Sequence, residues 1–397
     1  MTVLDNKTKL NYQNGYLIYN KKYIFKGKFL SKDQFKIAEI CFNTSMTGYQ
    51  EILTDPSYKS QFINFTFPLI GIVGCNNEDY ESWKIHASGL ICNELFELSS
   101  NWRAQTNFTN WIISQNSCAF FDLDTRAVTK IVRNFGPKNI MLCSEEYFEN
   151  KGIDEVCKQI DESLSLEEND VIKDFTTELN IEKQEIGKKK YSIAFLNFGA
   201  KDNIKKNLYS RNCKIEEFDM NFKAEDIINK NFDGFFLSNG PGDPKKVYEN
   251  IKPELNKLLN KKIPTFGICL GHQIIAHIYG GKTFKLLFGH RGGNQPVKEI
   301  NSGRVYPTSQ NHGYAVSDEN FPSDLEITHI NINDNTVSGL KHRERPIISI
   351  QYHSEACPGP VDSEYIFFMF NPPYTSTSKS ILFPIPQILS ISDFNVP

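Results

Sequence analysis

Between residues 191 and 278 the chain alternates buried strands with helical segments, and this alternation constrains the fold more than any other feature. The apolar stretches "YSIAFLNFG", "KIEEFDM", "DGFFLSNGPG" and "IPTFGI" are typical of strands, and "DNIKKNLYSRN" is typical of a helix. Strands that alternate with helices are joined by right-handed crossovers and form a parallel sheet. We therefore predict an α/β domain with a mostly parallel sheet flanked by helices.

Two of these strands end in glycine-containing turns, at residues 239–243 and 267–271. Ligands bind at the carboxyl ends of the strands in such sheets. The second turn, "GICLG", places Cys269 between a strand and a helix, as in a nucleophile elbow. The amino terminus of that helix favours a thiolate over a thiol. We interpret Cys269 as a candidate nucleophile.

Two other interpretations of Cys269 stay open at this point. It can be an inert buried cysteine, which is the usual state of a free cysteine in a core. It can also join His272 and His277 in a zinc site. On a helix these two histidines lie about 140° apart and do not share a face, which argues against zinc. We predict no metal ligands.

A base for the cysteine is predicted in "PIISIQYHSEACPGP", where a buried strand runs into His353 with Glu355 two residues later. The strand end brings His353 to the sheet edge of Cys269, and a carboxylate can orient the imidazole and stabilise its cation. In "LSNGPGDP", Gly240 and Gly242 free the backbone to approach a ligand. Their amides and the amide of Leu270 can form an oxyanion hole, although an ordinary glycine turn is an equally good interpretation of this motif alone.

The remainder of the chain suggests further units. Residues 1–150 mix short apolar stretches with turns and predict a strand-rich α+β domain, and residues 151–190 are charged and predict a helix and a linker. The α/β domain is assigned to residues 191–371. Residues 372–397 are rich in proline and predict an extended or disordered tail.

Composition excludes several classes of partner. A net charge of -3 gives no electrostatic reason to expect nucleic acid. No apolar run reaches the roughly 18 residues of a membrane span, and the first residues lack the order of a signal peptide. The nine cysteines are odd in number and scattered, which favours reduced thiols. We expect a cytoplasmic protein, or one of the plastid stroma if the gene is plastid-encoded.

In their order along the chain, "LSNGPGDP", "GICLGHQ" and "QYHSEA" resemble the class I glutamine amidotransferase domain, from about Tyr191 to Phe370. Further motifs, "FNTSMTGYQEILTDPSY" at 42–58, "DLDTRAVTK" at 122–130, and "GHRGGNQPV" with "TSQNHGYAV" at 289–316, resemble the glutamine-hydrolysing small subunit of carbamoyl phosphate synthetase. The first of them lies outside the amidotransferase domain, so it separates this family from relatives that share only the catalytic part.

The resemblance implies that Cys269 attacks the side-chain amide of glutamine, that His353 moves protons and that Glu355 orients His353. It also implies a set of residues that bind L-glutamine: Ser45, Gly240, Gly242, Leu270, Gln273, Asn311, Gly313 and Tyr314. Tyr314 stands where phenylalanine is common in the family. Ser354 replaces a usual proline, and Asn197 replaces a usual aspartate.

The resemblance further implies a large synthetase subunit as the partner. That subunit uses two ATP, with magnesium, to activate bicarbonate and carbamate, and it receives ammonia through an internal tunnel. The product feeds pyrimidine and arginine synthesis. This chain shows no nucleotide-binding fingerprint, so we expect no cofactor in it.

Three alternative functions are kept. They are an amidotransferase of another specificity, a non-catalytic regulatory subunit that retains the fold, and an independent cysteine hydrolase of peptides or γ-glutamyl compounds. The motif at 42–58 argues against the first, and the retained Cys269, His353 and Glu355 argue against the second.

Overall fold

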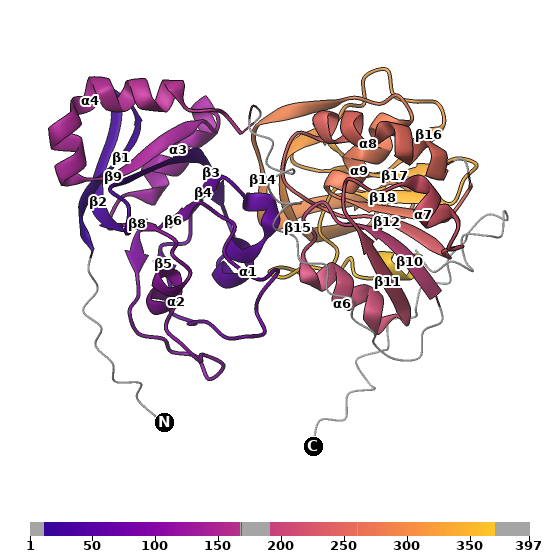
Figure 1. The fold of residues 1–397 in the computed structure, drawn as a ribbon, viewed down its shortest axis with the longest axis horizontal. Helices are drawn as coiled ribbons and strands as arrows, with labels where there is room; N and C mark the ends of the chain where they lie inside the picture. The colour runs from indigo at the N-terminus through magenta and orange to yellow at the C-terminus, as the bar shows by residue number, and fades with distance from the viewer. Residues whose placement is uncertain (1–11, 167, 169–190, 260, 370–397) are drawn as a thin grey trace.

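The computed structural model describes residues 12–166, 168, 191–259 and 261–369. They form two bodies that lie side by side, an N-terminal domain and a C-terminal domain (Figure 1). The predicted tail at 372–397 and almost all of the predicted linker after residue 166 lie outside the described residues. Within the described ranges, no helix has both the length and the apolar character that crossing a bilayer requires.

The N-terminal domain is built on a closed barrel with the strand order β1-β2-β8-β6-β4-β3-β9. Phe29, Phe62 and Phe120 are fully buried and pack in its core. The strands and helices of this domain are β1 (Gln13–Asn20), β2 (Tyr23–Leu30), β3 (Phe35–Asn43), α1 (Tyr49–Thr54), η1 (Pro56–Tyr58), β4 (Gln61–Phe65), β5 (Leu69–Ile70), β6 (Gly89–Ile91), β7 (Glu94–Leu95), α2 (Phe108–Ser114), β8 (Ala119–Phe121), α3 (Thr125–Phe135), β9 (Asn139–Ser144) and α4 (Glu145–Glu162).

Helix α4 packs on the outside of this barrel, so the packed N-terminal domain continues beyond residue 150, where the sequence predicted its end. Val156 and Ile160 of α4 are buried against Ile18 of β1 and Met141 of β9. The two α4 residues are four positions apart and therefore share one face of the helix. A narrow apolar face on a charged surface helix is enough for docking.

The C-terminal domain has a nine-stranded sheet with the order β11-β10-β12-β13-β18-β17-β15-β14-β16. The first five strands in this order, from β11 to β18, pair in parallel. The remaining strands, β17, β15, β14 and β16, pair with their neighbours in antiparallel fashion. The predicted α/β fold class is confirmed. The elements are β10 (Tyr191–Leu196), α6 (Asp202–Ser210), β11 (Cys213–Phe218), α7 (Ala224–Ile228), β12 (Gly234–Leu237), α8 (Pro244–Leu259), β13 (Thr265–Ile268), α9 (Leu270–Ile278), β14 (Thr283–Glu299), β15 (Val305–Val316), β16 (Leu325–Asn331), β17 (Val337–His342), β18 (Ile347–Ile350) and α10 (Ile366–Met369).

Strand β14 lies at the junction of the two domains (Figure 1). The ring of Phe288 stacks on Phe42 of the barrel, with centroids 5.8 Å apart. Arg291 accepts a hydrogen bond from the amide of Thr44 at 3.3 Å and donates from Nη2 to Gln61 Oε1 at 3.3 Å. These contacts bring side chains of the barrel to the edge of the C-terminal sheet.

Candidate active site

Cys269 occupies the sharp turn between strand β13 and helix α9. Its φ of 54° and ψ of -101° fall in a region that residues with a side chain rarely adopt. The amide of Cys269 donates to the carbonyl oxygen of Ile350 in β18 at 2.9 Å, which anchors the turn to the neighbouring strand. The structure therefore places Cys269 at a strained and anchored turn, the geometry of a nucleophile elbow.

The two glycines around Cys269 are required by close packing. A Cβ on Gly271 would lie 2.2 Å from the carbonyl oxygen of Leu237, and one on Gly267 would lie 2.7 Å from the carbonyl of Gly271. Both obstacles are backbone atoms, which cannot rotate away as a side chain can. The helix thus begins against β12, and that contact fixes where the turn stands.

We expect Gly271→Ala to lower the free energy of unfolding by about 1–3 kcal/mol, because the added methyl group overpacks this contact. Thermal unfolding of the variant and the wild type measures the loss. The control is Gly293→Ala, since a Cβ at Gly293 meets its nearest atom at 3.5 Å, an ordinary contact distance. A melting temperature of Gly271→Ala equal to that of the control would contradict the argument.

His353 and Glu355 form a buried ion pair beyond the end of β18. His353 Nδ1 lies 2.6 Å from Glu355 Oε1, and the two residues are 1% and 4% exposed. Burial opposes the charge on His353, but the carboxylate of Glu355 and the Cys269 side chain raise the pKa of the imidazole to about 10. Burial likewise opposes the charge of Glu355, while His353 and Lys201 lower its pKa to about 2. The pair therefore favours an imidazolium held by a carboxylate.

Strand register brings this pair to the cysteine. Ile268 of β13 pairs with Ile350 of β18, so the residues that follow both strands emerge at the same sheet edge. Cys269 Sγ donates to the carbonyl oxygen of Asn311 at 3.6 Å, and His353 Nε2, the ring nitrogen that does not face Glu355, is buried without a hydrogen-bond partner. The Cys269 side chain also raises the pKa of the His353 imidazole, so the two groups interact. Cys269, His353 and Glu355 are thus assembled in the order that the sequence predicted.

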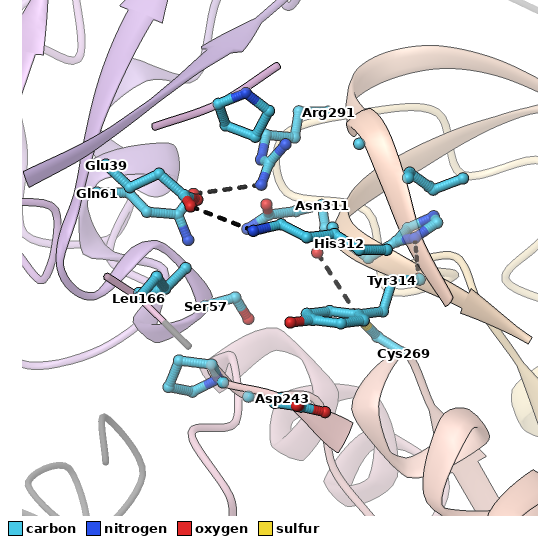
Figure 2. Close-up of a pocket in the computed structure, with 18 of the residues that line it drawn as sticks. Glu39, Ser57, Gln61, Leu166, Asp243, Cys269, Arg291, Asn311, His312 and Tyr314 are labelled. Carbon is cyan, nitrogen blue, oxygen red and sulfur yellow. Dashed lines mark hydrogen bonds and ion pairs between the residues drawn. The ribbon is translucent and has the colours of Figure 1, made fainter. Parts of the chain in front are cut away.

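A cavity opens in front of Cys269, between the two domains (Figure 2). The cavity is lined by six of the predicted glutamine-binding residues: Gly240, Gly242, Gln273, Asn311, Gly313 and Tyr314. The barrel contributes Glu39, Ser57 and Gln61 to its wall. The side chain of Leu270 points into the core and is 1% exposed, so only its backbone amide, in the first turn of α9, can face a ligand.

Ser45 does not line this cavity. It faces a smaller second cavity, and its amide donates to Asn43 Oδ1 at 2.7 Å. Another serine of the same motif, Ser57, lines the cavity of Cys269, where its Oγ accepts a hydrogen bond from Asn239 Nδ2 at 2.9 Å. The motif turns back at helix η1, whose amino terminus is capped by Asp55, and this turn carries Ser57 to the site. Ser57, and not the predicted Ser45, therefore lines the cavity of Cys269.

Lys201 is a further buried group of the site that the sequence analysis missed. Its Nζ lies 3.3 Å from Glu355 Oε1 and donates to the carbonyl oxygen of Ala356 at 2.5 Å. Burial disfavours its charge, yet Glu355 and two further carboxylates raise the pKa of Lys201 above its usual value. A lysine directly after the buried stretch "YSIAFLNFGA" was the available signal. The Glu355 carboxylate is therefore held between two cations.

Asp55 of the barrel also reaches the site. Its Oδ2 accepts a hydrogen bond from Asn311 Nδ2 at 3.0 Å, and the carbonyl oxygen of Asn311 lies 3.6 Å from Cys269 Sγ. Both Asp55 and Asn311 are buried. The N-terminal domain thus fixes the strand segment that faces the sulfur, a role that the sequence motifs could not indicate because these residues are more than 250 positions apart.

The substitution at Asn197 preserves local hydrogen bonding. Asn197 Oδ1 accepts from the amides of Gly199 and Ala200 at 3.0 and 2.8 Å, as a carboxylate oxygen could. Its Nδ2 donates to Glu217 Oε2 at 2.6 Å, which an aspartate could not do. Asparagine at position 197 therefore suits the neighbouring Glu217, to which it donates a hydrogen bond. Ser354 is fully buried between His353 and Glu355.

The two histidines considered for a zinc site form hydrogen bonds with other side chains. His272 Nδ1 lies 3.0 Å from Ser349 Oγ, and His277 Nε2 lies 3.0 Å from Thr283 Oγ1. Burial lowers the pKa of His272 to about 3. Across the part of the chain that the structure describes, no three histidine, cysteine or acidic side chains come together as a metal site would require.

Fold and site together define a class I glutamine amidotransferase, and a family model described as "Glutamine amidotransferase class-I" matches residues 194–371. A second model, "Carbamoyl-phosphate synthase small chain, CPSase domain", matches residues 17–142. The carbamoyl phosphate synthase small chain of Clostridium perfringens is 42% identical over 365 residues, which cover 92% of this chain and 98% of that relative. The small chain of Akkermansia muciniphila is 42% identical over 355 residues, which cover 87% of this chain and 93% of that relative. The chain belongs to the family of carbamoyl phosphate synthase small chains, and the predicted resemblance is confirmed.

Proposed function

We propose that this chain hydrolyses glutamine to glutamate and ammonia, with Cys269 as the nucleophile, and delivers the ammonia to a large synthetase subunit that makes carbamoyl phosphate. The observation that carries the proposal is the strained turn that presents Cys269 to a cavity with the His353–Glu355 ion pair behind it. A buried thiol in contact with an imidazole paired to a carboxylate is the arrangement of a cysteine nucleophile.

In the proposed reaction the thiolate of Cys269 attacks the carbon of the glutamine side-chain amide. The oxyanion that forms is stabilised by backbone amides at Leu270 and at the Gly240–Gly242 turn. His353 gives its proton to the leaving nitrogen, and ammonia departs from the thioester. His353 then takes a proton from a water molecule whose oxygen attacks the thioester carbon. The carbon–sulfur bond breaks, the glutamate side chain leaves as a carboxylic acid that loses its proton to solvent, and the thiolate–imidazolium pair is restored.

Recognition of the substrate depends on residues around the cavity. Gln273 donates from Nε2 to the carbonyl oxygen of Tyr314 at 2.7 Å, which directs its amide oxygen toward a ligand ammonium group. The Oγ of Ser57 accepts from Asn239, so its proton can be donated to a ligand carboxylate. We therefore assign the serine contact to Ser57 in place of Ser45.

We expect Ser57→Ala to raise the KM for glutamine about tenfold with little change in kcat, because a hydrogen bond to a charged group is lost from binding. Steady-state kinetics of glutamate release measures both constants. Ser45→Ala is the matched control, since Ser45 lies in the same motif but outside the cavity of Cys269, and its KM should equal that of the wild type. If Ser45→Ala raised the KM for glutamine and Ser57→Ala did not, the contact with glutamine would belong to Ser45.

Ammonia needs a protected exit, because in neutral water it becomes ammonium, which is not a nucleophile. A second, smaller cavity is lined by Ser45, Lys201 and His353 among others. Asn311 lines both cavities. We propose this second cavity as the beginning of the path toward the large subunit. ATP and magnesium are expected on that subunit and not on this chain.

One assay separates the proposed function from its rivals. Glutamate release is measured for the purified chain alone and with its large subunit. We expect weak activity alone and strong activation by the partner. An independent hydrolase would be supported if the rate of glutamate release were the same with and without the large subunit and the chain also cleaved other γ-glutamyl compounds. No release under either condition would support a non-catalytic subunit.

A further inference from the structure

Glu81 is a buried carboxylate of the N-terminal domain to which the proposed reaction gives no task. It lies in the loop between β5 and β6 and is 1% exposed. Its hydrogen bonds to the C-terminal domain go to the first residues of helix α6. Its backbone carbonyl oxygen accepts from the amide of Asp202 at 2.9 Å, and its carboxylate accepts from the amide and the Nδ2 of Asn203 at 3.2 and 2.8 Å.

Helix α6 needs these contacts because its own cap residue cannot supply them. The residue at the N-cap position is Lys201, and it makes no side-chain cap hydrogen bond. A lysine side chain has no acceptor, so the first amides of the helix would stay unsatisfied. Glu81 accepts from two of them, from the amide of Asp202 through its backbone carbonyl oxygen and from the amide of Asn203 through its side chain. The cap of α6 is thus provided by another domain.

The capped end of α6 is also where the site is held. Lys201 directs its ammonium group away from the helix to Glu355, at 3.3 Å, and to the carbonyl oxygen of Ala356. Glu355 in turn contacts His353 at 2.6 Å. A displacement at the start of α6 therefore moves the ammonium group, then the carboxylate, then the imidazole.

We propose that Glu81 is a positioning residue for glutamine hydrolysis, which acts by capping α6 from the N-terminal domain and so holding Lys201 against Glu355. The inference rests on the proposed function of the Cys269 site. It gives the barrel domain a direct part in aligning the imidazole, although Glu81 does not line the cavity in front of Cys269.

Burial opposes the charge on Glu81 and raises the pKa of its carboxyl group to about 8, and the positive charge of Lys201 limits that rise. Glu81, Glu355 and Asp55 together hold the pKa of Lys201 above its usual value. Without Glu81, the ammonium group depends more strongly on Glu355, and a misplacement of even about 1 Å at a reacting group can cost on the order of 100-fold in rate.

The test uses the full chain with its large subunit and compares wild type, Glu81→Gln, Lys201→Met and the double variant in glutamate release. We expect Glu81→Gln to lower kcat about tenfold and to change the glutamine KM by less than about twofold, because glutamine does not contact Glu81. In the Lys201→Met background, Glu81→Gln should cause no further loss, since both residues act through one contact. Glu78→Gln is the matched control, since Glu78 is exposed, pairs with Arg103 and should leave kcat unchanged.

Asn203→Asp provides an independent approach if Glu81→Gln is poorly folded, which thermal unfolding reveals. It places a carboxylate against Glu81 and should lower kcat by a similar factor. The inference would be overturned if Glu81→Gln, or Asn203→Asp used in its place, kept the wild-type kcat. It would also be overturned if the losses of kcat in Glu81→Gln and Lys201→Met multiplied in the double variant. Either outcome leaves the proposed function intact, provided that the wild type releases glutamate and Cys269→Ala does not. Glutamate release by Cys269→Ala would instead overturn the proposed function itself.

Discussion

Replacing Cys269 by alanine should abolish glutamine hydrolysis, with kcat lowered about 10⁵-fold or more, the scale on which enzymes lose activity when their nucleophile is removed. Without the sulfur no thioester can form, and the imidazole has no thiol to activate. Alanine fits the site, because Cys269 is buried and the substitution only removes an atom. Glutamate release, followed with the large subunit present, measures the loss.

Two controls separate lost chemistry from lost structure. Cys213→Ala removes a sulfur that is also buried but contacts the backbone of Arg211, outside the cavity, and it should keep wild-type kcat. With ammonium salts supplied directly, the complex containing Cys269→Ala should still make carbamoyl phosphate, since only the source of ammonia is missing. Glutamate release by Cys269→Ala at the wild-type rate would exclude Cys269 as the nucleophile.

Glu355→Gln should lower kcat by about 10³-fold to 10⁴-fold, which is large but smaller than the effect at Cys269. The carboxylate orients the imidazole and stabilises its cation but does not react. A neutral amide can instead donate to Nδ1 and hold the wrong tautomer. It also leaves the buried ammonium group of Lys201 without its nearest counter-charge, which the 3.3 Å contact supplies in the wild type.

The dependence of kcat on pH gives a second measurement on the same variant. Glu355 raises the pKa of His353 to about 10, so removing its charge should lower the pKa at which the imidazole loses its proton. The imidazolium is complete below that pKa and is lost as the pH rises through it, so the alkaline limb of the profile should move to lower pH. The control is Glu364→Gln on the surface, which pairs with Arg211 and should change neither kcat nor the profile. If Glu355→Gln lowered kcat as much as Cys269→Ala does, the division of roles between an orienting carboxylate and an attacking sulfur would be wrong.

Much of the C-terminal domain was accessible from the sequence because its signals are local. The strand periods, the glycines at 267 and 271 and the position of Cys269 between a strand and a helix all lie within a few residues of one another. Parallel strands require the residues that follow β13 and β18 to emerge at one sheet edge, so the placement of Cys269 and His353 at the same edge could be predicted without coordinates.

The contribution of the barrel could not be predicted in the same way. Ser57 and Asp55 reach the site, and Glu81 reaches the start of α6, only because the N-terminal domain packs against the C-terminal domain. The motif at 42–58 suggested a substrate contact but offered several serines and threonines of similar polarity. Which of them faces the cavity depends on the direction of the turn at η1, and that direction is set by tertiary packing.

The sequence alone determined the class of chemistry, since a cysteine on a turn between glycines, a histidine at a strand end and a glutamate two residues later are properties of the chain order. Only the tertiary structure decided how those groups are held. Lys201 balances Glu355, and its helix is capped by a residue 120 positions earlier in the chain, Glu81. A buried charge takes its partner from whatever segment the fold brings within a few ångströms, and sequence separation carries no information about that distance.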